Sequence, residues 1–160
     1  MPVLGTHHGF ANQKLESQSS VEVASSSIRR QVILAEYQGT PVAFPSLWVD
    51  EVMFFPCQQL YHLPFYPSQL LGLVPHHGRL VPLVEKVDVN ADTSTKAHLQ
   101  EHIRAIRLSQ HAGPFNGVAI IVDKIIGTMS TEEFERQTDV QLFSPDDLAT
   151  DTFQPHRWVE

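Results

Sequence analysis

The chain has 160 residues, of which 42% are hydrophobic and 18% charged, and its formal net charge is -7. This length suits one compact domain, or two small subdomains that share a core, and the composition lets apolar burial offset chain entropy without staples. The 11 lysines and arginines form no basic stripe that could neutralise phosphates, so we expect no nucleic-acid partner.

Cysteine usage and hydropathy indicate the compartment. The single cysteine, Cys57, cannot form an internal disulfide or a structural zinc site, which agrees with a reducing environment. No stretch approaches the ~18 to 20 apolar residues that span a bilayer, and the N-terminus lacks the layout of a signal peptide. We therefore expect a cytoplasmic protein without direct membrane insertion.

The first part of the chain divides into a tail and a strand-rich domain. Residues 1–27 are rich in Ser, Gln, Gly and His without an apolar period, which predicts a flexible tail before a domain over 28–160. Strand formers at 31–37 and 41–44 flank Gln38-Gly39-Thr40, a pattern that predicts a hairpin. A short helical turn capped by Ser46 is expected next, before strand character resumes up to Pro56.

A proline-rich loop and a second hairpin follow. Pro64 and Pro67 remove backbone donors and predict an extended connection. Residues 70–74 and 79–84 read as two strands separated by a turn at Pro75-His-His-Gly78. This pairing predicts the second hairpin of the domain.

The remaining chain adds further strands and little helix. Residues 102–108 alternate with period two, which predicts one buried face, whereas the β-branched run 118–122 predicts a strand buried on both faces. A turn at 113–117 joins them, and 123–129 continue extended. Ser144, followed by proline and two acids, predicts the start of a short helix. Roughly eight short strands favour an all-β barrel or sandwich.

The nine histidines raise a metal hypothesis. His98 and His102 are four apart, and His76 and His77 adjoin a glycine turn. The first pair would share a face only on a helix, whereas His102 opens a strand, and no acid or thiol stands at ligand spacing. Solvated loop histidines are the preferred interpretation, so we predict no metal site and no cofactor.

Catalytic signatures are not evident in the sequence. Cys57 follows a proline in an aromatic stretch without nearby positive charge, which favours an inert, partly buried thiol. Gly72 and Gly78 flank a hairpin rather than opening a helix, so no phosphate loop is predicted. We predict no enzyme and no catalytic residues, and keep a small metal-dependent hydrolase with histidine ligands as the alternative from a different class.

Six aromatic side chains lie between Trp48 and Tyr66 and could form an interaction surface. Trp48 and Phe54 are expected to lie largely inside the domain. Prolines surround Tyr61, Phe65 and Tyr66. For these three side chains, packing in the core and lying in a surface groove are about equally expected.

Five sequence elements between about Gln31 and Met129 together resemble the CheW-like family in order and spacing. They are an E-V element at Val49-Asp-Glu-Val52, an L-P-x-x-P loop from Leu63 to Pro67, a G-x-V turn at Gly72-Leu-Val74, a P-L-V strand at Gly78-Arg-Leu-Val-Pro-Leu-Val84, and a late G-x-x-x-x-V-D element from Gly117 to Asp123. Each element alone is unspecific, and the specificity lies in their combination.

The resemblance implies a fold of two intertwined, five-stranded SH3-like barrels with short helices. It also implies a non-catalytic adaptor that couples the cytoplasmic tip of a methyl-accepting receptor to a CheA-like histidine kinase, in chemotaxis, phototaxis or pilus motility. By matching motif positions, Val49 and Glu51 fall near the kinase contact, and Val74, His77 and Gly78 near the receptor groove. A diverged member that acts as a competitor or assembly partner without receptor coupling is the alternative within this class.

Two departures from the family pattern affect these implications. The family usually has N-L-R-G where this chain has Pro75-His76-His77-Gly78, so a mostly neutral histidine replaces a permanently charged arginine. Family members also continue into a last strand and helix after a segment like Pro155-His-Arg-Trp-Val159. The resemblance therefore implies a C-terminal part that is shortened, closes differently, or receives a strand from a partner.

Overall fold

The computed structural model describes residues 30–86 and 101–156, and strands dominate both ranges. The predicted tail at 1–27 and His98 lie outside these residues. The strands are, in chain order, β1 (Gln31–Tyr37), β2 (Thr40–Pro45), β3 (Val49–Pro56), β4 (Leu70–His76), β5 (Arg79–Val84), β6 (His102–Leu108), β7 (Ala119–Val122), β8 (Lys124–Ser130) and β9 (Gln141–Leu142). The helical segments are the 3-10 turns η1 (Ser46–Trp48), η2 (Cys57–Gln59), η4 (Gln110–Phe115) and η5 (Pro145–Asp147), and the α-helix α2 (Thr131–Glu135).

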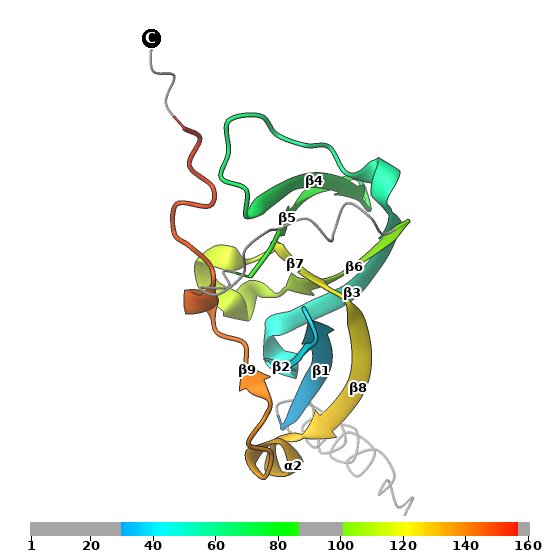
Figure 1. Ribbon diagram of the computed structural model, residues 1–160, viewed down its shortest axis with the longest axis vertical. Coiled ribbons are helices and arrows are strands. Elements are labelled where there is room, and N and C mark those ends of the chain that lie inside the picture. Colours follow the sequence, from blue (N-terminus) through cyan, green and yellow to red (C-terminus); the bar gives the residue numbers. More distant parts are fainter. Residues whose placement is uncertain (1–29, 87–100, 157–160) are drawn as a thin grey trace, which may run out of the picture.

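These strands form two sheets that are interleaved along the chain. One sheet has the order β8-β1-β2-β9 and the other the order β3-β6-β7-β5-β4. The pairs β2–β9 and β5–β7 are parallel, and the remaining pairs are antiparallel. Figure 1 shows the four-stranded sheet below the five-stranded sheet, with β8 returning to pair with β1. The all-β fold class is confirmed, and the described part of the first sheet has four strands.

The five-stranded sheet curls, and a short bridge after β3 draws its far edge inward. Tyr61 and Leu73 exchange both backbone hydrogen bonds, at 2.8 and 2.9 Å. Gly72 lies beside this bridge with φ +149°, and a Cβ built there would stand 2.3 Å from the Tyr61 carbonyl oxygen. Where two backbones approach each other this closely, only glycine fits, because it has no Cβ atom.

One hydrophobic core serves both sheets. Phe44 of the first sheet stacks on Phe143, with ring centroids 4.7 Å apart, and Trp48 meets Phe143 edge-on at 6.5 Å. The Phe143 backbone N–H also donates to the Ala43 carbonyl at 2.8 Å. The segment after α2 is thus anchored in the core rather than lying loosely on it.

Burial confirms most of the strand assignments and corrects some details. Strand β7 is buried throughout, as predicted. Strand β6 does not keep the predicted alternation, because the consecutive residues Ala105 and Ile106 are both fully buried. Phe54 was expected inside but is 59% exposed, because β3 alternates and gives its inward positions to Met53 and Phe55. The predicted cap at Ser46 is wrong: Pro45 occupies the N-cap of η1, and no side chain caps this turn.

The C-terminal helix start is confirmed. Ser144 caps η5 in a capping box with Asp147, with Pro145 in the first turn. No helix in the described ranges combines the length and apolar character that crossing a bilayer requires.

Candidate functional site

The turn between β4 and β5 projects two exposed residues, His77 and Gly78. His76 and Arg79 face each other in the register, so the turn has two central residues, and their φ angles are +46° and +74°. Two consecutive positive φ values characterise the type I′ hairpin, whose twist matches that of the flanking strands. The predicted turn is confirmed, and Gly78 occupies a position that disfavours side chains.

Beside this turn, β3 and β4 meet through their side chains. The Nε2 atom of His76 lies 3.0 Å from Oε1 of Glu51. Its neighbour His77 packs edge-on against it, with ring centroids 4.1 Å apart. One potential ligand atom from each of Glu51, His76 and His77 falls within 4.8 Å of the other two. The hairpin end therefore forms one polar cluster with β3.

Arg107 completes the charge pattern around Glu51. A bulge in β3 shifts the register between Val49 and Glu51, so Glu51 stands opposite Arg107 and Asp50 is the extra residue. The Arg107 guanidinium consequently reaches both carboxylates, with Nε 2.8 Å from Glu51 Oε1 and Nη2 in contact with Asp50.

The polar atoms of this cluster are close together but not well satisfied. Glu51 Oε1, His76 Nε2 and Arg107 Nε are all buried, and none has a hydrogen-bond partner of acceptable geometry. Burial raises the pKa of Glu51, but the contact with His76 and the positive charge of Arg107 outweigh it, so that the pKa lies below its ordinary value. Glu51 is therefore a carboxylate at neutral pH.

A second exposed feature follows the outer face of β3. Val52 is 46% and Phe54 59% exposed. The Arg104 guanidinium stands 5.1 Å from the Phe54 ring centroid, and the His102 ring stacks on Phe54 at 4.9 Å. Because β3 ends the sheet order, this apolar strip lies at an edge of the described sheet.

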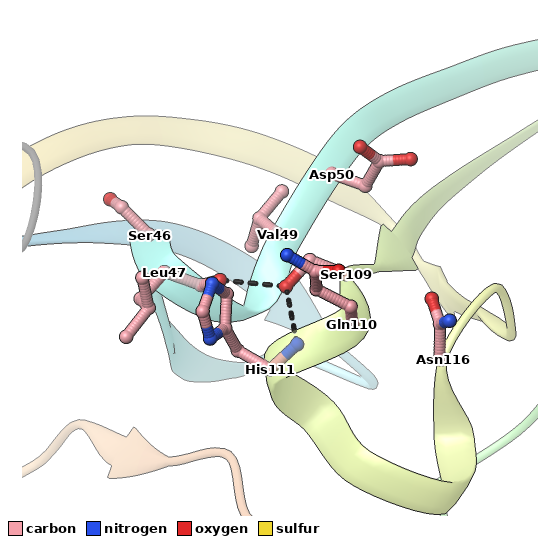
Figure 2. Close-up of a pocket in the computed structure, with 8 residues that line it drawn as sticks. All are labelled: Ser46, Leu47, Val49, Asp50, Ser109, Gln110, His111 and Asn116. Atoms are coloured by element: carbon pink, nitrogen blue, oxygen red, sulfur yellow. Dashed lines mark hydrogen bonds between the residues drawn. The ribbon is translucent and has the colours of Figure 1, made fainter.

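A shallow pocket of about 450 Å³ opens where η1 and β3 meet η4. Figure 2 shows the Ser109 side chain at its centre, where the hydroxyl donates to the Leu47 carbonyl at 2.7 Å and accepts from the His111 N–H at 3.2 Å. The lining residues are Ser46, Leu47, Val49, Asp50, Ser109, Gln110, His111 and Asn116. Of the residues taken from the family resemblance, only Val49 lines it.

The structure separates the expected site residues by burial. Val49 and Glu51 are half-buried on β3, and His77 and Gly78 are exposed at the turn, whereas Val74 is fully buried. Val74 therefore supports the hairpin from the core. Glu51 and His77, which the resemblance assigns to different partners, lie in the same cluster.

Sequence reasoning did not anticipate Arg107, the contact of His76 with Glu51 or the exposure of Phe54. Arg107 and the contact of His76 with Glu51 depend on how the sheet closes, for which the local sequence holds no signal. The exposure of Phe54 did have a signal, since it alternates with the inward-facing Met53 and Phe55.

Comparisons with known proteins bear on the fold alone. The sequence matches neither a protein-family model nor a curated protein. Among solved structures, the scaffolding protein CheW of Thermoanaerobacter tengcongensis matches with a TM-score of 0.50 and 13% sequence identity. The match covers 64% of this chain and 65% of that protein, so less than two thirds of its length is spanned. The chain has an all-β, CheW-like fold.

Proposed function

We propose that this chain is a non-catalytic signalling adaptor that couples a methyl-accepting receptor to a CheA-like histidine kinase in the cytoplasm. The observation that carries the proposal is the fold shared with a scaffolding protein. The motif resemblance over 31–129 supports the same class, and chemotaxis, phototaxis and pilus motility are the pathways in which such an adaptor acts.

The kinase is proposed to dock along β3. This strand ends the five-stranded sheet, and its exposed face carries Val52 and Phe54. An exposed apolar strip adds buried area when a second barrel approaches, and a polar surround fits the anatomy of such interfaces. The half-buried Val49 and Glu51 lie on this same strand.

The receptor is proposed to contact the β4–β5 turn. His77 and Gly78 are exposed there, and Leu80 of β5 is 61% exposed just beyond them. An apolar side chain next to a polar turn suits a helix laid across the surface. Because histidine replaces the family's arginine, a receptor that binds this turn needs no carboxylate opposite residue 77.

The hydrolase alternative has less support. Glu51, His76 and His77 could supply the metal ligands that a hydrolase would need, but none of the three lines the pocket of Figure 2. Hydrolysis would need a substrate cleft and a general base beside the ion. An adaptor needs neither a substrate cleft nor a general base, so we prefer the adaptor proposal.

Binding measurements with two purified partners test the proposal. The full chain is titrated with a receptor-tip fragment and with the kinase's regulatory domain, both with a chelator present. We expect both to bind, with His77→Asn weakening only the receptor and Phe54→Ser only the kinase. His111→Asn, at an exposed pocket histidine, is the matched control. Binding of the kinase alone would favour the competitor or assembly-partner alternative, and binding of neither would contradict the proposal.

A further inference from the structure

We propose that Glu51, His76 and His77 form a binding site for a divalent transition-metal ion of the zinc class. The three residues come from β3 and from the β4–β5 turn, and their potential ligand atoms all lie within 4.8 Å of one another. The site goes beyond the proposed adaptor function and does not depend on it.

The donor set selects the kind of ion. Two imidazole nitrogens and one carboxylate oxygen suit Zn²⁺, Cu²⁺ or Ni²⁺, whereas Mg²⁺ and Ca²⁺ prefer oxygen ligands. Three protein ligands leave a fourth tetrahedral position for water or for a group of a bound partner. The Glu51 side chain offers a carboxylate oxygen, a ligand that Zn²⁺ accepts beside histidine nitrogens.

Two of the ligand atoms already stand at a suitable separation. Zinc bonds of about 2.0 to 2.1 Å in a tetrahedron place neighbouring ligand atoms about 3.3 Å apart. His76 Nε2 and Glu51 Oε1 are 3.0 Å apart. His77 lies on an exposed turn, so its ring can rotate to complete the set without moving buried atoms.

The polar atoms at the cluster centre also favour an ion. His76 Nε2 and Glu51 Oε1 are buried and make no hydrogen bond of acceptable geometry, and a shared metal bond would satisfy both. Arg107 competes for Glu51, since its Nε lies 2.8 Å from the same oxygen. Arg107 also contacts Asp50, so this carboxylate can keep the guanidinium when Glu51 turns to a metal.

An ion at this position would tie the hairpin end to β3. These two strands form opposite ends of the five-stranded sheet order, so the ion would clamp the sheet's edges together. Binding to the folded state alone raises stability by mass action. The melting temperature should therefore rise with the concentration of added Zn²⁺.

Calorimetric titration with Zn²⁺ tests the site directly. The full chain is prepared without a histidine tag, stripped with a chelator, and titrated near neutral pH. We expect one ion per chain at this site, and at least about tenfold weaker binding in His77→Asn and in Glu51→Gln, because each loses one of three ligands. Asparagine tolerates the positive φ at position 77, so His77→Asn keeps the turn. His111→Asn is the control that should bind like the wild type.

A second measurement separates loss of a ligand from loss of folding. Imidazole ¹⁵N spectra of the folded protein should show the ring signals of His76 and His77 shifting with Zn²⁺ and unchanged with Mg²⁺. Unchanged signals, or wild-type affinity in both ligand variants, would overturn the proposal by placing any bound Zn²⁺ elsewhere. Neither measurement involves a kinase or receptor, so failure here is distinct from failure of the adaptor function.

Discussion

The carboxylate of Glu51 lies 3.0 Å from Nε2 of His76, and this contact joins the first and last strands of the five-stranded sheet. Arg107, from the strand next to β3, approaches the same oxygen at 2.8 Å. The cluster thus holds the exposed β4–β5 turn against the strand that we propose as the kinase edge. We therefore expect changes at this contact to alter the stability of the fold.

Replacing Glu51 tests how much this contact contributes to stability. Because the folded state lowers the pKa of Glu51, its carboxylate stabilises the fold above the unfolded pKa of about 4.3, and this contribution is lost as the pH falls through the lower folded value. We expect Glu51→Gln to lower the free energy of unfolding by about 1 to 2 kcal/mol at neutral pH. Urea denaturation at about pH 7 and about pH 4 measures the change. Equal stability of variant and wild type at both values would contradict it.

Glu85 predicts the opposite pH dependence. Burial raises the pKa of this residue to about 7. The folded state therefore holds the proton more tightly than the unfolded chain, and the stabilisation present at low pH is lost as the pH rises from about 4.3 toward the folded value. Glu85→Gln stays neutral, and we expect it to exceed the wild type at about pH 8 by up to about 3 kcal/mol. Denaturation curves at about pH 5 and about pH 8 check this, and a variant less stable at the higher pH would refute it.

Gly72 provides a steric prediction. A Cβ at this position would stand 2.3 Å from the Tyr61 carbonyl oxygen, so Gly72→Ala forces the bridge between Tyr61 and Leu73 apart. We expect a loss of about 2 to 3 kcal/mol in unfolding free energy. Gly127→Ala is the matched control, because nothing lies within 4 Å of a Cβ there, and should be near neutral. Equal effects of the two changes would remove the close approach as the cause.

The β4–β5 turn is tested at Gly78. Its φ of +74° strains a β-branched residue, although a Cβ there would meet no atom within 4 Å. Gly78→Val should therefore cost about 1 to 2 kcal/mol, and Gly78→Asn clearly less, because asparagine tolerates this region. Thermal denaturation of both variants measures the difference in stability between them. Similar melting temperatures for both would show that the turn does not depend on its backbone conformation.

The predictable parts of the fold were those with local causes. Gln38-Gly39 and His77-Gly78 both produced two-residue turns with positive φ, and the β-branched run ending at Val122 is buried throughout. Helix α2 also had a local signal that was overlooked, the Ser-x-x-Glu box formed by Ser130 and Glu133.

The remaining features depend on distant parts of the chain. Strand β9 has two residues and exists because the chain returns to pair with β2. The sequence interpretation found no acid at ligand spacing from His76 and His77, yet sheet closure brings Glu51 to both. Such contacts arise from the topology of the sheet, so the spacing of residues along the sequence does not predict them.

Bridging of two partners tests the adaptor function most directly. Receptor-tip fragments on beads are mixed with the kinase's regulatory domain, with and without the full chain, and the retained kinase domain is measured. We expect the kinase domain to be retained only when the chain is present, and we expect His77→Asn to reduce retention while His111→Asn does not. Retention that is equally weak with and without the folded chain would rule out a bridging role for this protein.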